Sequence, residues 1–154
     1  MNCTYFSIPP PKPQLISNPG IAMKFKQIIL IDDDVAVNYY HRYIIEHEKL
    51  AESILVADNV DDGMQLLFDI PPVSSSNTDV SLILLDINMP KYTGFELIQK
   101  YPSVFERAEQ NGFYTLILTT SDNPEDLATA NQFSVIKGYL QKPLTVEKLQ
   151  EISL

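Results

Sequence analysis

The feature that most constrains the fold is a repeated change in the spacing of apolar residues along the chain, from short continuous runs to helical spacing. Short apolar runs at 27–31, 53–57, 80–86, 114–120 and 138–141 fit strands, and segments with helical spacing follow them. Parallel strands that are buried on both faces read as continuous apolar runs, and their connecting helices make right-handed crossovers. The pattern therefore predicts a three-layer α/β/α sandwich around a five-stranded parallel sheet. We expect the strand order 2-1-3-4-5, which is one of the common orders of such doubly wound sheets.

Helices are expected after the strands, at about 35–48, 60–69, 94–101, 122–132 and 145–152. Asp34 and Asn59 occupy N-cap positions, and Asn123 precedes Pro124 in the first helical position. Pro102 is expected to end the third helix.

The first helix is predicted from Val37, Tyr40 and Ile44, which sit at helical spacing. His41 and His47 fall in the same helix, away from the strand ends, and are expected to face solvent or a partner. They do not predict a phosphohistidine relay, because a transfer domain needs a helical bundle that this pattern lacks.

The composition fits one domain, since 154 residues with 45% hydrophobic content suffice for one core. We assign this domain to residues 23–154, because Met23 opens the first apolar segment. Residues 1–22 hold five prolines between positions 9 and 19 and are expected to form a disordered extension.

The charge and the cysteine content exclude several classes of protein. With 20 acidic and 11 basic residues, the net charge of -9 argues against direct nucleic-acid binding. The lone Cys3 fits a reducing compartment, and the N-terminus lacks the features of a secretory signal. No apolar run approaches the roughly 18 residues of a membrane span. A cytoplasmic protein is expected.

Polar side chains follow four of the predicted strands. Asp32, Asp33 and Asp34 follow the first, Asp86 the third, Thr119 and Thr120 end the fourth, and Lys142 follows the fifth. The carboxyl ends of parallel strands meet at one edge of the sheet, so the carboxylates should repel each other unless a cation joins them. Oxygen ligands in this number suit Mg²⁺, and acids, a lysine and a hydroxyl together are typical of a phosphoryl-transfer site.

The segments IILIDDD, LILLDINMP, LILTTS and YLQKP resemble the receiver domain of bacterial two-component response regulators, which has a CheY-like, flavodoxin-like fold. The resemblance spans residues 24–153. It implies that Asp86 is the phosphoacceptor, which takes a phosphoryl group from a phosphohistidine and becomes an acyl phosphate. It also implies that Asp33 binds Mg²⁺ directly and Asp32 through water, with Asp86 and the backbone carbonyl of Asn88 completing the shell.

Further roles follow from the same resemblance. Thr119 is expected to donate its hydroxyl to a phosphoryl oxygen, and Lys142 to pair with another from a cis Lys142–Pro143 bond. Tyr139 matches the aromatic switch position, which turns inward when Thr119 moves. Thr120 stands where many relatives have a smaller residue, and Ser121 and Asn88 flank the site.

We expect a stand-alone response regulator, because no output domain follows Leu154 in this sequence. The resemblance implies self-phosphotransfer and self-dephosphorylation only, rather than an enzyme that acts on external substrates. Its expected partners are a sensor histidine kinase or phosphotransfer protein and a downstream protein. The downstream protein would bind the face formed by the fourth predicted helix, the fifth strand and the last helix, with no nucleic acid or membrane involved.

Two alternatives remain open at the level of sequence. The first is a receiver-like docking module that acts without phosphorylation, although the acid set with Asp86, Thr119 and Lys142 is complete. The second is a phosphatase of the haloacid dehalogenase type. That family needs Asp-x-Asp-x-Thr or Val, whereas Asp32 opens the segment DDDVA.

Overall fold

The computed structural model describes residues 23–71 and 79–154, so the predicted extension 1–22 lies outside the described residues. In chain order the elements are β1 (Phe25–Ile31), α1 (Val35–His47), β2 (Ala51–Ala57), α2 (Val60–Phe68), β3 (Ser81–Asp86), α3 (Gly94–Lys100), α4 (Pro102–Gln110), β4 (Phe113–Thr119), α5 (Pro124–Ala130), β5 (Ile136–Gln141) and α6 (Val146–Glu151). Within the described ranges, no helix has the length and apolar character needed to cross a membrane.

The five strands form one parallel sheet with the order β2-β1-β3-β4-β5, which confirms the predicted topology. The central strand β3 is buried along its whole length. Its run of leucine and isoleucine can be buried on both faces because helices cover both sides of the sheet.

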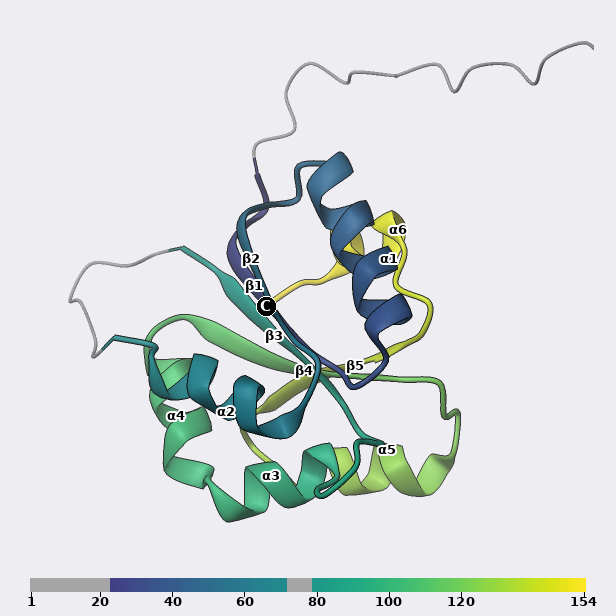
Figure 1. The fold of residues 1–154 in the computed structure, drawn as a ribbon. Helices are drawn as coiled ribbons and strands as arrows, with labels where there is room; N and C mark the ends of the chain where they lie inside the picture. Colours follow the sequence, from purple (N-terminus) through teal and green to yellow (C-terminus); the bar gives the residue numbers. More distant parts are fainter. Residues whose placement is uncertain (1–22, 72–78) are drawn as a thin grey trace, which may run out of the picture.

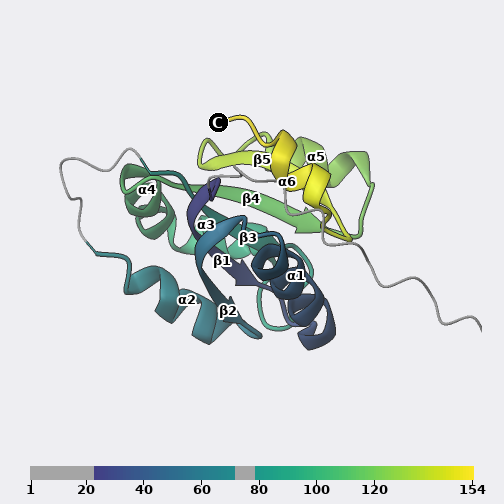
Figure 2. The same ribbon diagram turned by 90° about the horizontal axis from the view of Figure 1, so that it is seen from above.

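The helices form the two outer layers of the sandwich. Helices α1 and α6 cover one face, and α2, α3, α4 and α5 lie on the other (Figure 1). Seen from above, β5 lies at one edge with α5 and α6, and β2 lies at the other edge with α1 and α2 (Figure 2).

Side chains alternate between two cores along the central strands. Ile83 and Leu85 of β3 face the core under α2, α3 and α4, whereas Leu82 and Leu84 face the core under α1 and α6. Burying each such side chain contributes about 1.5–3 kcal/mol. The two cores hold the strand ends in place.

The predicted helix starts are confirmed by capping bonds. Asp34 accepts the N–H groups of Ala36 and Val37, at 3.0 and 3.1 Å. Asn59 and Asn123 cap α2 and α5 in the same way. These side chains satisfy N–H groups that have no partner inside the helix.

The sequence prediction missed α4. Pro102 ends α3, as expected, but it also starts a second helix that runs to Gln110. Proline suits the first helical position because it lacks only an N–H that would have no helical partner there. The buried face of α4, formed by Val104, Phe105 and Ala108, packs onto the sheet.

The buried side of α1 differs from the apolar spacing in the sequence. Asn38, His41 and Ile45 are buried, whereas Tyr40 is 47% exposed. The prediction that His41 faces solvent or a partner is therefore wrong. The structure turns two polar side chains inward because each finds a hydrogen-bond partner near the strand ends. His47 is exposed, as expected.

Candidate functional site at the carboxyl edge of the sheet

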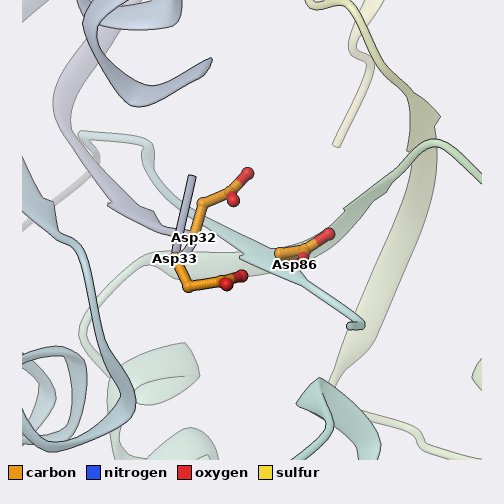
Figure 3. Close-up of side chains that lie close together, drawn as sticks. All are labelled: Asp32, Asp33 and Asp86. Atoms are coloured by element: carbon orange, nitrogen blue, oxygen red, sulfur yellow. The ribbon is translucent and has the colours of Figure 1, made fainter. Parts of the chain in front are cut away.

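Three aspartates meet at the carboxyl edge of the sheet. Asp32 and Asp33 directly follow β1, and Asp86 is the last residue of β3, the strand paired with β1. One carboxylate oxygen from each lies within 4.8 Å of the other two. Figure 3 shows the three side chains gathered at the ends of these neighbouring strands. This arrangement agrees with the expectation from the sequence, because adjacent parallel strands end side by side.

Lys142, the first residue after β5, reaches two of these aspartates. Its Nζ lies 2.5 Å from Oδ2 of Asp32 and 2.9 Å from Oδ1 of Asp86, and its side chain is only 9% exposed. Burial alone would lower the pKa of Lys142, but hydrogen bonds to the two carboxylates outweigh it and raise that pKa. Lys142 therefore stays charged at neutral pH. The following Lys142–Pro143 bond is cis, as predicted.

Negative charge exceeds positive charge in this cluster. Burial raises the pKa of Asp86, hydrogen bonding and charge from Lys142 oppose the rise, and Asp32 and Asp33 add to it. Lys142 bonds to two of the three carboxylates and supplies one positive charge, so like charges remain close together. Asp33 is more accessible to solvent than the other two.

The cluster could hold a divalent metal ion. Carboxylate oxygens are hard ligands of the kind that Mg²⁺ prefers, and a divalent cation would balance the surplus negative charge. Asn88, whose backbone carbonyl was predicted as a further ligand, lies two residues beyond β3 and is exposed. The donor set therefore fits a magnesium ion.

Thr119 lies at the end of β4, next to the strand that carries Asp86. It is fully buried, and its neighbour Leu118 is the residue paired with Asp86 across the two strands. The Thr119 hydroxyl accepts the N–H of Ser121 at 3.1 Å, and its carbonyl accepts the N–H of Lys142 at 2.7 Å. The ends of β4 and β5 are thus linked directly beside the acid cluster. Thr120 is exposed.

Tyr139 on β5 lies beside this end of β4. Its phenol donates to the carbonyl of Ser121 at 3.1 Å, and the ring packs against the core under α2, α3 and α4. Burial raises the pKa of Tyr139, and a hydrogen bond with Thr119 partly opposes the rise. Tyr139 therefore contacts both Thr119 and the loop that follows it.

Asn38 supports the site and was not identified from the sequence. Its Nδ2 donates to the backbone carbonyl of Asp32 and to Oδ1 of Asp58, each at 2.8 Å. Asn38 thus ties the end of β1 to the residue after β2. Positions 38, 41 and 45 have the spacing of one helix face, which could have indicated a buried face. Two of the three residues are polar, however, and a buried face is normally recognised from apolar residues.

Comparison with known proteins gives a consistent match. A family model described as "Response regulator receiver domain" matches residues 28–153. The solved structure of a two-component response regulator from Cytophaga hutchinsonii is 29% identical, with a TM-score of 0.69, and the match covers 82% of this chain and 92% of that one. A response regulator receiver protein from Dyadobacter fermentans DSM 18053 is 22% identical, with a TM-score of 0.65, and the match covers 82% and 93% of the two chains.

A curated protein also matches. The chain is 23% identical over 131 residues to a Bacillus subtilis (strain 168) protein named "Probable C4-dicarboxylate response regulator DctR". The match covers 85% of this chain and 52% of that protein, so the chain spans about half the length of this relative.

Proposed function

This chain belongs to the response regulator receiver domain family of two-component systems, and on that premise we propose that it accepts a phosphoryl group from a phosphohistidine onto Asp86. The observation that supports the proposal best is the position of Asp86. Its carboxylate is buried, lies beside two further carboxylates and bonds to a buried ammonium. Such a cluster has little value as packing, and with a divalent cation added it would suit the transfer of a negatively charged group.

In the transfer step, a carboxylate oxygen of Asp86 attacks the phosphorus atom. A new P–O bond forms as the P–N bond to the histidine breaks, and the electron pair of that bond stays on the imidazole. Lys142 offsets charge on a phosphoryl oxygen, and the Thr119 hydroxyl donates to another. Since only the ionised carboxylate is nucleophilic, Lys142 also assists by opposing the burial that raises the pKa of Asp86.

We propose that the acid cluster binds Mg²⁺ for this reaction. Asp33 and Asp86 would be direct ligands, and Asp32 would bind through water. The backbone carbonyl of Asn88 would complete the set of ligands that the protein supplies. When bound, Mg²⁺ supplies positive charge that is shared between the carboxylates and the phosphoryl oxygens.

The proposed output is a change in protein binding. Phosphorylation would draw Thr119 toward the phosphoryl group, and Tyr139 would turn into the space it leaves. Both residues adjoin the face formed by α5, β5 and α6, which is the fourth-helix, fifth-strand and last-helix face expected from the sequence. Leu127 on α5 is 48% exposed and offers apolar surface to a downstream protein.

The first test is intact mass after incubation with a small acyl-phosphate donor and Mg²⁺. We expect a gain of one phosphoryl group in the wild type and in Asp69→Asn, an exposed acid outside the cluster, but none in Asp86→Asn or in a metal-free sample. If the wild type gains no mass, the phosphorylation-independent docking module becomes the better description. In a separate assay with Mg²⁺, hydrolysis of a generic phosphomonoester would instead support a phosphatase of the haloacid dehalogenase type.

A further inference from the structure

His41 connects α1 to the turn that carries Lys142. The ring is 1% exposed, and its Nε2 accepts the backbone N–H of Leu144 at 3.1 Å, across 103 residues of sequence. Leu144 lies two residues after Lys142, in the segment between β5 and α6. A buried backbone N–H without a partner costs about 1–3 kcal/mol, so this bond constrains where the turn can lie.

The hydrogen bond to Leu144 also determines the protonation state of the His41 ring. Because Nε2 accepts a hydrogen bond from the Leu144 N–H, the ring is neutral and carries its own proton on Nδ1. Burial lowers the pKa of His41 to about 4, so the acceptor is present at neutral pH. Nδ1 itself has no hydrogen-bond partner among the described residues.

Other hydrogen bonds also hold the turn between β5 and α6. The Lys142 N–H bonds to the carbonyl of Thr119, and the Lys148 ammonium donates to the carbonyls of Gln141 and Pro143, at 2.6 and 2.8 Å. The bonds of Lys148 are exposed to solvent, whereas that of His41 is buried. His41 therefore supplies the anchor on the α1 side of the turn.

The same helix also positions an acid. Asn38, one helical turn before His41, donates to the backbone carbonyl of Asp32, whose carboxylate lies 2.5 Å from Lys142 Nζ. Two side chains that share one face of α1 thus bond to the backbone of Asp32 and to the backbone two residues after Lys142. A rigid helix can in this way set the distance between them.

We propose that His41 is a positioning residue for phosphoryl transfer, which holds the β5–α6 turn so that the Lys142 ammonium reaches Asp86. The inference rests on the proposed function for its role in transfer, but the positioning of Lys142 can be measured without it. His41 itself contacts no reacting group; it acts through the backbone at Leu144.

The test measures the rate of phosphoryl gain by intact mass, with the full chain in saturating Mg²⁺ and a small acyl-phosphate donor. His41→Met removes the acceptor at similar size, whereas His41→Gln keeps an acceptor oxygen at similar reach. We expect His41→Met to be about tenfold slower and His41→Gln to stay within about threefold of the wild type. His47→Met, at an exposed position of the same helix, should not change the rate.

A double-mutant cycle with Lys142→Met separates positioning from general destabilisation. Once Lys142 is gone, His41→Met should slow the reaction no further, because the group that His41 positions is absent. Equal slowing in both backgrounds would overturn the proposal, as would equal rates for the wild type and His41→Met.

A second readout does not need phosphorylation. In metal-free protein labelled with ¹⁵N-lysine, the protons on Lys142 Nζ should exchange slowly with water, because the ammonium is buried between its aspartates. We expect His41→Asn, whose side chain is too short to reach Leu144, to speed this exchange, and His41→Gln to preserve it. Unchanged exchange in both variants would refute the positioning role, whether or not Asp86 accepts phosphate. His41→Asn also replaces His41→Met in the rate measurements if the methionine variant does not fold.

Discussion

Acid should destabilise this protein through His41. The ring is buried and bonded as a neutral acceptor, and its pKa in the folded protein is lowered from 6.5 to about 4. The main cause is burial; Asp32 at the end of β1 opposes it, whereas Lys142 after β5 and Lys148 on α6 add to it. Protonation would turn Nε2 into a donor that faces the Leu144 N–H, so the bond would be lost.

The sign and the size of this pH effect on the free energy of unfolding follow from the linkage between proton binding and folding. Because the folded protein binds this proton less readily than the unfolded chain, the contribution of His41 is complete above pH 6.5 and falls as the pH drops toward 4. The full shift corresponds to about 3 kcal/mol, at about 1.4 kcal/mol for each pH unit. Between pH 7.5 and pH 5, this group should remove about 2 kcal/mol from the free energy of unfolding.

The assay is urea unfolding at several pH values between 5 and 7.5, without metal, for the wild type, His41→Gln and His47→Gln. Other groups also titrate in this range, so the comparison between variants isolates His41. Stability of His41→Gln should fall about 2 kcal/mol less than that of the wild type. His47→Gln removes an exposed histidine and should follow the wild type. Parallel curves for the wild type and His41→Gln would refute the reasoning.

Three further predictions concern the acid cluster and its supports. Lys142→Met leaves two buried carboxylates without their cation and should lower the free energy of unfolding by about 3 kcal/mol, with part of the loss restored by Mg²⁺ in urea titrations. Asp33→Asn removes one of three like charges, so the metal-free protein should gain up to about 1 kcal/mol, and its Tm should no longer rise with Mg²⁺; a preserved Mg²⁺ response would exclude Asp33 as a ligand. Gly94→Ala would place a Cβ 2.5 Å from the backbone oxygen of Asp86 and should cost about 1–3 kcal/mol in thermal unfolding. Gly63→Ala would place a Cβ 2.7 Å from a side-chain atom of Ile31 rather than from backbone and should cost less; equal losses would contradict this explanation.

Much of the fold was predictable because its signals are local. Each strand is a short apolar run, and each predicted cap is a polar side chain next to its own helix. The missed helix α4 shows the limit of such signals. A proline such as Pro102 can end one helix or begin another, and its neighbours in sequence do not show which. Only the packing of Val104 and Phe105 against the core shows that a helix begins here.

The candidate site was predictable to a similar degree. Asp32, Asp33, Asp86 and Lys142 follow strands directly, so the topology alone brings them to one edge. Asn38 and His41 were not predictable in this way, since their partners lie on other segments of the chain and a polar residue in a helix usually faces solvent.

By itself, the sequence determined the strands, most of the helices between them and the acids that follow the strands, because the spacing of apolar residues acts through neighbours along the chain. The tertiary structure alone decided which carboxylates share Lys142, which side of α1 is buried, and that His41 bonds to Leu144. These contacts depend on distances between segments far apart in sequence. Such distances are set only when both cores pack against the sheet.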